Sequence, residues 1–381
     1  MRFPEFSGEW KKMTLEHVTD FVKERISTDI LTLANYVSTE NMKSDFGGIT
    51  PAISIPNNTN VIHYHKDDVL LSNIRPYLRK VWAANGDGGC SADVFVFRAK
   101  SIFPSFLYCI MANDTFINYV MSGAKGVKMP RGDKEQMLKY VFSIPSIEEQ
   151  SKISRLLHLL DERIATQNKI IEKLQSLIKG LTHKAAEIGL KKGSWEKALL
   201  STVLIERKEL NSNFYTVHSV SVSEGVINQI DYLGRSFAAK DTSNYHVAHK
   251  GDIIYTKSPT GNFPYGIVKQ SYIDEPVAIS PLYGVYSPVS FELGVYIHYY
   301  FMSAVSATNY LYPLIQKGAK NTINISNQRF LENRIALPLK QTDIYNIARV
   351  LITIQKKLDI EKCAMDSLTK QRSYLLQQLF I

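Results

Sequence analysis

Two apolar stripes with heptad spacing constrain the fold of this 381-residue chain more than any other feature. The first stripe begins at Ile153, and the second begins 194 residues later at Ile347. In each stripe, apolar residues recur alternately four and three residues apart for about four heptads, which is typical of a coiled-coil seam. A helix with one such seam needs one partner, and the chain supplies two matching helices. We therefore predict that residues 146–192 and 341–381 form two long helices that pack against each other.

Both stripes are interrupted by a polar residue at the same place. Gln167 and Glu361 are each the fifth of ten seam positions. In an antiparallel pair, position five faces position six, so the two polar residues would occupy adjacent central layers and fix the register. The alternative, that each side chain is solvated at the edge of the seam, fits the sequence equally well. The predicted seam residues are Ile153, Leu157, Leu160, Ile164, Gln167, Ile171, Leu174, Ile178 and Leu181, and then Ile347, Leu351, Ile354, Leu358, Glu361, Met365, Leu368, Leu375 and Leu379.

Short landmarks in the first half of the chain recur in the same order in the second half. Their separations drift only from 184 to 195 residues, so a duplicated unit is the simplest explanation. If the two copies are related by a pseudo-twofold axis, the two long helices are antiparallel. The helices would then hold two globular segments on the order of 50 Å apart, because a helix rises about 1.5 Å per residue. The landmark pairs are Trp10 and Trp195, residues 65–70 and 249–254, residues 123–125 and 318–320, and residues 144–145 and 337–338.

In each copy, the predicted secondary structure changes from strands to helix at the Pro of the last landmark, Pro145 or Pro338. Short β-rich runs broken by Gly, Pro and Asn turns precede it, and one long helix follows it. Ser146 and Glu149 have the spacing of a capping box, and Gly189 and Gly193 are expected to end the first helix. The predicted fold class is α+β, with two tandem mixed α/β domains separated by two long helices that form an antiparallel coiled coil in a pseudo-twofold internal repeat. The predicted parts are residues 1–145, 146–192, 193–340 and 341–381.

Five segments make the chain resemble the specificity subunits of type I restriction-modification systems. They are residues 3–10, 68–77, 88–93, 123–125 and 144–150, the last of which is followed by the heptad helix. The second copy departs from the family at its boundary, where Leu-Pro-Leu-Lys-Gln-Thr stands in place of the usual acidic-Gln pair. The resemblance spans the whole chain and implies two target-recognition domains and two conserved spacer helices.

This resemblance implies a non-catalytic subunit that recognises double-stranded DNA. Each target-recognition domain would read one half of a bipartite, asymmetric site, and the helices would set the spacer and dock two modification (methyltransferase) subunits. Those partners would use S-adenosylmethionine to methylate adenine, and restriction subunits would add ATP- and Mg-dependent translocation and cleavage. The chain itself would hold no cofactor. Three widely spaced cysteines, and no apolar run of about 20 residues, favour a cytoplasmic protein.

No catalytic or phosphate-binding motif is present in the sequence. The chain has no Pro-Pro dipeptide, which the Asn/Asp-Pro-Pro-aromatic signature of adenine methyltransferases requires, and it has no P-loop and no H-E-x-x-H. His63 and His65, close to Asp67 and Asp68, resemble a metal cluster. Alternating His residues on a strand before a solvated turn are more often a surface feature, so we predict no metal site.

Three basic clusters interleaved with Gly, Pro or aromatic residues, one of them with a counterpart in the second copy, are the candidate DNA-contacting loops. Arg, Lys, Asn and Gln are the side chains that most often reach base edges, while other cations hold phosphates. The alternative is that these loops are ordinary solvated turns. The candidate residues are Asn73, Arg75, Arg79, Lys80, Lys125, Lys128 and Arg131 in the first copy, and Lys257, Asn262, Lys317, Lys320 and Asn321 in the second.

The net charge of +9 is unevenly distributed along the chain. Residues 1–150 carry 17 basic and 17 acidic groups, whereas residues 151–192 carry 9 and 4, and residues 341–381 carry 6 and 4. Specificity should therefore depend on local loops in nearly neutral domains, with the helices or partner subunits supplying much of the nonspecific phosphate affinity. Two alternatives of other classes stay open: a two-headed coiled-coil adaptor that binds proteins and no nucleic acid, and an enzyme with an unfamiliar site, for which the sequence offers no motif.

Overall fold

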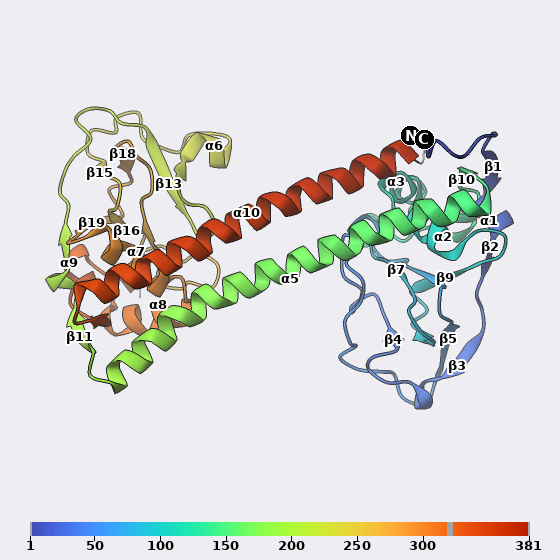
Figure 1. Cartoon of the computed structure of the whole chain (residues 1–381), viewed down its shortest axis with the longest axis horizontal. Helices are drawn as coiled ribbons and strands as arrows, with labels where there is room; N and C mark the ends of the chain where they lie inside the picture. Colours follow the sequence, from blue (N-terminus) through green and yellow to red (C-terminus); the bar gives the residue numbers. More distant parts are fainter. Residues whose placement is uncertain (1, 318–322, 380–381) are drawn as a thin grey trace. The chain divides into compact units, whose positions relative to one another are not determined.

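A computed structural model describes residues 2–317 and 323–379 of the chain (Figure 1). The chain divides into two compact units, one made of residues 1–167 with 364–381 and the other of residues 168–363. The fold is mixed, with 40% helix and 23% strand, which confirms the predicted α+β class. We call residues 2–146 the first head and residues 192–340 the second head. Both long helices contribute to both units, since each unit boundary falls within them.

The first head is built on two four-stranded sheets. One has the strand order β2-β9-β6-β7, with every pair antiparallel, and the other has the order β3-β5-β8-β4, in which β4 and β8 are parallel. A separate antiparallel pair, β1 and β10, joins the two ends of the head just before α5 begins. The elements are β1 (Lys11–Thr14), α1 (Leu15–Val18), β2 (Thr19–Phe21), β3 (Arg25–Ser27), η1 (Thr28–Ile30), β4 (Tyr36–Val37), β5 (Asn60–Tyr64), β6 (Val69–Ser72), η2 (Pro76–Leu78), β7 (Val81–Ala83), β8 (Gly88–Cys90), β9 (Val94–Ala99), α2 (Pro104–Met111), α3 (Asp114–Ser122), α4 (Lys134–Leu138), β10 (Val141–Ile144) and α5 (Ile147–Lys191).

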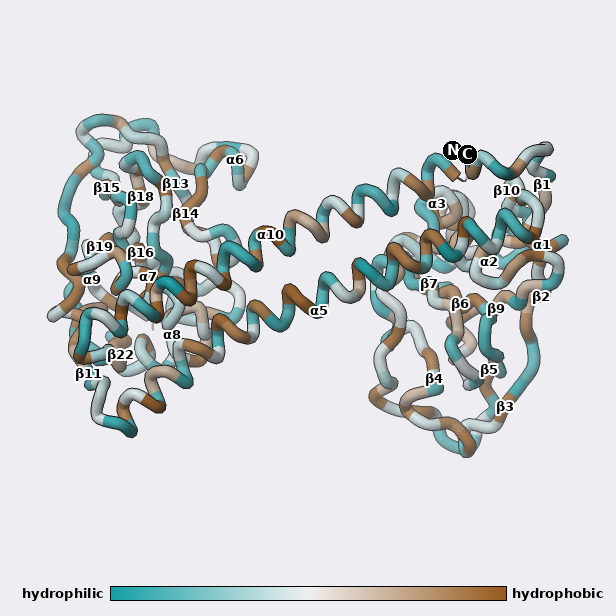
Figure 2. The backbone as a smooth tube through the Cα atoms, in the orientation of Figure 1, coloured by the Kyte–Doolittle hydropathy of each residue, from teal (hydrophilic) through white to brown (hydrophobic). Residues whose placement is uncertain are grey.

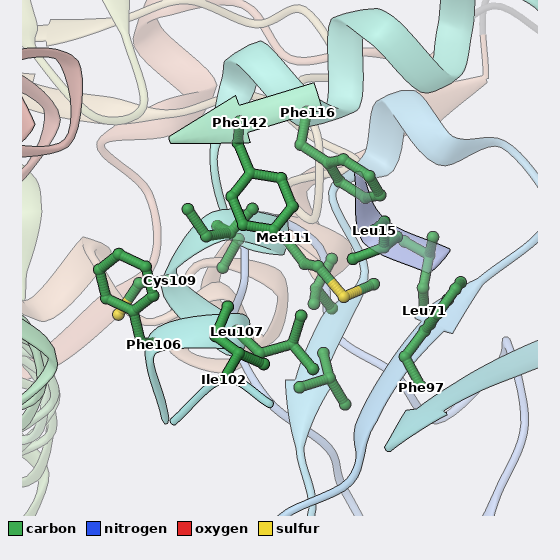
Figure 3. Packing of buried hydrophobic residues seen from close by; sticks show 14 of the residues in the cluster. Leu15, Leu71, Phe97, Ile102, Phe106, Leu107, Cys109, Met111, Phe116 and Phe142 are labelled. Carbon is green, nitrogen blue, oxygen red and sulfur yellow. The ribbon is translucent and has the colours of Figure 1, made fainter. Parts of the chain in front are cut away.

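The main core of the first unit lies between the first sheet and helices α2 and α3 (Figure 3). Helix α2 starts with Pro104 in its first turn, where the missing N–H is not needed, and five of its eight residues are buried. Figure 3 shows Phe106, Leu107 and Met111 of this helix among core side chains from the neighbouring elements. Four residues of the long helices, Ile153, Leu157, Leu376 and Leu379, belong to the same cluster.

The Gly-Gly-Cys segment forms β8, which is central in the second sheet. A Cβ on Gly88 would lie 2.2 Å from the carbonyl oxygen of Asn35 and 2.4 Å from the Tyr64 hydroxyl, and a Cβ on Gly89 would lie 2.5 Å from Leu31 Cδ1. No side chain fits at either position. Close packing therefore explains the two glycines of residues 88–93, one of the segments that carry the family resemblance.

The second head has two four-stranded sheets of closely related design. Their strand orders are β12-β19-β16-β17 and β14-β13-β18-β15, and β11 pairs with β22 as β1 pairs with β10. The elements are β11 (Trp195–Leu199), η3 (Leu200–Thr202), β12 (Leu204–Glu206), β13 (Val217–Ser221), β14 (Gly225–Asn228), α6 (Gln229–Leu233), β15 (His246–Ala248), β16 (Ile253–Tyr255), β17 (Val268–Gln270), β18 (Val277–Ile279), β19 (Gly284–Pro288), α7 (Phe291–Phe301), α8 (Ala304–Leu311), η4 (Tyr312–Leu314), β20 (Gln316–Lys317), β21 (Ile323–Asn324), α9 (Asn327–Phe330), β22 (Arg334–Pro338) and α10 (Gln341–Leu379).

Comparison of the two heads confirms the internal repeat. Strand for strand, the order β2-β9-β6-β7 matches β12-β19-β16-β17. The second sheets share three strands with the same relative directions, β5-β8-β4 and β15-β18-β13. Their fourth strands lie at opposite edges, because β3 pairs with β5 whereas β14 pairs with β13. The two heads therefore share one framework and differ at the edge of the second sheet.

Helices α5 and α10 pack antiparallel within each unit. In the first unit, the beginning of α5 shares a core with the end of α10; in the second, the end of α5 shares cores with the beginning of α10, where Ile178 packs near Leu351 and Leu358. Every predicted seam residue is buried or partly buried. Figure 2 shows hydrophobic residues recurring along both helices. The antiparallel coiled coil predicted from the sequence is thus confirmed.

The central polar residues of the seam fall in different units. Gln167 belongs to the first unit and Glu361 to the second, and both are partly buried. Glu361 forms an ion pair with Lys357 of its own helix. Their predicted placement in adjacent layers stays a prediction, as does the four-part division of the chain into residues 1–145, 146–192, 193–340 and 341–381.

Two expectations about the ends of α5 were wrong in detail. The Glu149 amide donates to Ser146 Oγ at 3.3 Å, but the fully buried Glu149 carboxylate accepts from Arg2 Nε and Nη2 at 2.9 and 2.8 Å instead of completing the capping box. A buried carboxylate is stabilised more by a cation than by an amide. Gly193, with φ +67°, follows the end of α5, whereas Gly189 lies inside the helix, where a Cβ would be 2.1 Å from Trp195 Cδ1.

In the described ranges, no helix is both long enough and apolar enough to span a membrane.

Candidate nucleic-acid interface

The loop after β6 and the segment 123–132 lie together at one end of the first sheet. The Arg75 amide donates to the carbonyl of Pro130 at 2.8 Å, and the Gly132 amide donates to the carbonyl of Asn73 at 3.1 Å. Lys125 and Arg131 exchange two backbone hydrogen bonds of 2.9 Å each. Two of the basic clusters chosen from the sequence are therefore one structural site.

Arg75 and Lys128 are the candidate cations of this site that are most available. Both are exposed, and neither side chain has an ion pair or hydrogen bond recorded with the described residues 2–317 and 323–379. Arg75 also has a left-handed backbone conformation, with φ 51° and ψ 62°, which costs a non-glycine residue about 1–2 kcal/mol. Backbone strain of this kind concentrates at functional sites.

The other two cations of the segment each have an acidic partner but stay largely exposed. Lys125 Nζ lies 2.7 Å from Asp133 Oδ2, and this contact raises the pKa of the lysine. Arg131 Nη1 lies 3.2 Å from Asp93. Their side chains are 82% and 55% exposed, so each pair is screened by solvent and an incoming phosphate can compete for the cation.

Three sequence candidates of the first head are engaged within the fold. Asn73 is only 9% exposed. Arg79 pairs with Asp45 at 3.0 Å and with Asp114 at 2.8 Å, and Lys80 Nζ donates to the carbonyl of Thr39 at 2.6 Å. These contacts shape the loop, since each ties it to a segment distant in the sequence.

The second head has a similar loop after β16. Lys257 has φ 62°, so a basic residue with left-handed backbone follows this strand as well. It is half-buried, and desolvation lowers its pKa while Glu206 opposes the shift. Asn262 lies at the exposed tip, where Thr260 and Phe263 exchange two backbone hydrogen bonds of 3.0 Å.

Of the remaining candidates, only Lys317 lies among the described residues, in β20, which pairs antiparallel with β21. Lys317 of β20 is opposite Ile323 of β21. Lys320 and Asn321 lie outside the described residues.

A buried ion cluster underlies the start of β6 and of β16. In the first head, Asp68 is 2% exposed and accepts from Arg98 Nε and Nη2, each at 2.9 Å. In the second head, Asp252 is 2% exposed and accepts from Arg207 Nε at 2.6 Å and Nη2 at 3.1 Å. Arg98 is on β9, whereas Arg207 follows β12, the counterpart of β2. The two heads thus neutralise the same aspartate with arginines from different strands.

A glutamate and a histidine extend each cluster. Glu24 accepts from Arg98 Nη1 at 2.8 Å and lies 3.2 Å from His65 Nε2. Glu209 lies 2.7 Å from His249 Nε2 in the second head. Sequence reasoning missed Glu24 and Glu209, although they recur 185 residues apart, the same interval as Trp10 and Trp195.

Comparisons with known proteins agree on one family that this chain resembles. A family model described as the type I restriction modification DNA specificity domain matches residues 8–176. The chain is 24% identical over 312 residues to the type I restriction enzyme MjaVIII specificity subunit of Methanocaldococcus jannaschii, covering 73% of this chain and 70% of that one. The chain therefore resembles the specificity subunits of type I restriction-modification systems. Within this family, it is also 28% identical over 119 residues to the EcoDI specificity subunit of Escherichia coli. That match spans 31% of this chain and only 27% of the relative.

Solved structures of the family share the fold. A type I restriction-modification S subunit from M. genitalium matches with a TM-score of 0.64 and 14% identity, covering 100% of this chain and 99% of that one. A chain from a structure of a type I restriction-modification system matches with a TM-score of 0.51 and 17% identity, covering 98% of each chain. These matches show that the chain shares the fold of those structures.

Proposed function

We propose that this chain is the non-catalytic DNA-recognition subunit of a type I restriction-modification complex. The observation that carries the proposal is the duplicated head, with strand order β2-β9-β6-β7 repeated as β12-β19-β16-β17 in a chain that resembles the specificity family. Two copies of one framework with different edges are suited to reading two different sequences. The first head reads one half of a bipartite, asymmetric site in double-stranded DNA, and the second head reads the other half.

The loops after β6 and β16 contact the DNA in this proposal. The exposed Arg75 and Lys128 support this role in the first head, and Lys257 and Asn262 occupy the corresponding end of the sheet in the second. Asn262 at an exposed turn can accept and donate to a base edge, and the cations can hold phosphates or a guanine edge. Lys317, Lys320 and Asn321 are assigned to the same interface by their place in the repeat.

The long helices set the spacer between the half-sites and dock two modification subunits. The lengths of α5 and α10, 45 and 39 residues, support a rigid spacer, and the net positive charge of their residues supports a contribution to phosphate binding. S-adenosylmethionine belongs to the modification subunits, and ATP with Mg belongs to the restriction subunits. The complex acts in the cytoplasm, where its DNA lies.

The direct test is the methylation pattern of a host. The chain and its modification subunit are expressed in a strain without adenine methylation, and every methylated adenine is mapped by sequencing. The proposal predicts one bipartite, asymmetric motif with a fixed spacer, absent when either component is omitted. Methylation without this chain, or a single uninterrupted motif, would contradict it.

A further inference from the structure

We propose that the first head binds one divalent transition-metal ion, with Zn²⁺ as the best fit, through Glu24, His63 and His65. One donor atom from each of these residues lies within 4.8 Å of the other two. Imidazole and carboxylate are ligands that suit Zn²⁺. The site is separate from the loops assigned to DNA, since β5 and the segment after β2 supply its residues.

The ligands come from two neighbouring segments of backbone. His63 is in β5 and His65 directly follows it, so residues two apart place both imidazoles on one face, with ring centroids 4.3 Å apart. The His63 amide donates to the Glu24 carbonyl at 2.8 Å, which brings Glu24 beside them. Its Oε2 lies 3.2 Å from His65 Nε2 and 4.0 Å from His63 Nδ1. Two ligand atoms on a tetrahedral zinc lie about 3.3 Å apart, so Glu24 and His65 already have this spacing and His63 has to move closer to become the third ligand.

Groups behind the ligands hold two of them in the required orientation. Asp87 Oδ2 lies 3.0 Å from His65 Nδ1, and Asp87 Oδ1 accepts from the Lys66 amide at 2.9 Å. This leaves His65 Nε2 for the metal, in the carboxylate–histidine–metal arrangement common at zinc sites. Arg98 likewise holds Glu24 Oε1 at 2.8 Å and leaves Oε2 for the ion. The side chains of Glu24, His63 and His65 are 51%, 24% and 39% exposed, so water has access as a fourth ligand.

Without metal, the same groups form an ion cluster. His65 then donates to both Asp87 and Glu24, and the hydrogen bond to Asp87 raises the pKa of the imidazole. A metal ion has to displace the proton on Nε2, so metal affinity should fall as the solution becomes more acidic. The sequence places Asp67 and Asp68 closest to the histidines, and the pattern of a strand followed by a solvated turn favours a surface feature over a metal site. Neither aspartate is the ligand, and Glu24 lies 39 residues before His63.

The second head retains the ion pair but lacks the rest of the site. Glu209 and His249 match Glu24 and His65, yet Val247 occupies the ladder position of His63, opposite Ala278 as His63 is opposite Gly89. Pro276 precedes β18 where Asp87 precedes β8. A shared scaffold therefore folds with Val at the position of His63. His63→Val therefore removes a ligand and introduces the residue that the second head has at the matching position.

The test is direct metal binding by the full-length, tag-free chain after treatment with a chelator. Co²⁺ is titrated as a spectroscopic probe near neutral pH, and Zn²⁺ is then added to displace it. We expect one Co²⁺ per chain, with the visible absorption of tetrahedral coordination. His63→Val and His65→Ala should each lower the affinity at least tenfold, and Asp87→Asn should lower it by about 10–100-fold.

His249→Ala, which removes the matching histidine of the second head, is the control and should leave Co²⁺ affinity unchanged. Circular dichroism verifies that each variant is folded. Failure of the wild-type chain to bind Co²⁺ or Zn²⁺ stoichiometrically, or equal affinity in wild type and folded His63→Val, would overturn the proposal. Either result would leave the cluster as a set of ion pairs, and neither would affect the methylation test of DNA recognition.

Discussion

Arg372 of α10 forms an ion pair with Asp161 of α5, and its Nη2 lies 3.3 Å from Asp161 Oδ2. Its guanidinium also lies 5.7 Å from the ring centroid of Phe46 in the first head. Arg372 occupies a position of the heptad stripe where an apolar residue is expected, and its side chain is only 15% exposed. One side chain therefore ties both long helices to the first head within the first unit.

Arg372→Ala should destabilise the first unit by about 1.5–3 kcal/mol, the usual contribution of hydrogen bonds to charged groups, because it leaves Asp161 without its cation. The free energy of unfolding measured in urea tests this. Lys370→Ala, an exposed change on the same helix, should stay within about 0.5 kcal/mol of wild type. The double variant Asp161→Leu with Arg372→Met should recover most of the loss, since an apolar pair can replace a buried ion pair. Equal stability of Arg372→Ala and Lys370→Ala would show that the pair contributes nothing.

Gly88→Ala should destabilise the first head by about 1–3 kcal/mol, because the added Cβ would overlap Asn35 and Tyr64 in the middle of the second sheet. Gly86→Ala is the matched control, because a Cβ there meets nothing within 4 Å and its φ is not positive. Thermal unfolding of the two variants should separate them by several degrees. If both unfold together with wild type, the close packing of β8 is not required.

The outline of the fold could be predicted from the sequence because its signals are local and repeated. The heptad stripes and the recurring landmarks around Trp10 and Trp195 each indicate one element and its copy. The opposite placement of β3 and β14 could not be predicted, because each pairs through a backbone edge that carries no distinctive residue. The sequence also could not predict that Arg98 pairs with the buried aspartate in the first head and Arg207 in the second, because an arginine on either strand can reach that aspartate.

The candidate site was predictable only in part. Arg75 and Lys128 were predicted from the sequence as DNA-contacting cations, and both are exposed. Asn73, equally plausible from the sequence, is buried, because the loop folds back under the segment 123–132. The role of Glu24 depends on a backbone contact with His63 across 39 residues, which no local pattern reveals.

Arg75→Ala and Lys128→Ala should weaken DNA binding by the complex with its modification subunits. A residue that holds a phosphate will weaken binding to all sequences and reduce the salt dependence, whereas one that reads a base will cost about 1–3 kcal/mol and relax one position of the site. Gel-shift titrations at several salt concentrations distinguish the two. Lys100→Ala is the control, since Lys100 follows β9 at the opposite end of the same sheet and pairs with Asp20. Unchanged affinity and sequence preference in both variants would remove this loop from the interface.

His65 should make the stability of the first head depend on pH in the absence of metal. Its hydrogen bond to Asp87 raises the pKa of the folded imidazole above the ordinary value of 6.5. The stabilisation is therefore complete below pH 6.5 and is lost as the pH rises through the folded pKa. With a chelator present, the stability difference between wild type and His65→Ala should be larger near pH 6 than near pH 9. A difference that grows with pH would contradict the assigned ion cluster.

The exchange of one head tests most directly whether each head reads its own half-site. Residues 1–145 are replaced by the corresponding segment of another family member with a known motif, and the methylated adenines of a host carrying the chimera are mapped. Only one half of the bipartite motif should change, with the other half and the spacer retained. A change in both halves, or in neither, would contradict modular recognition by the two heads.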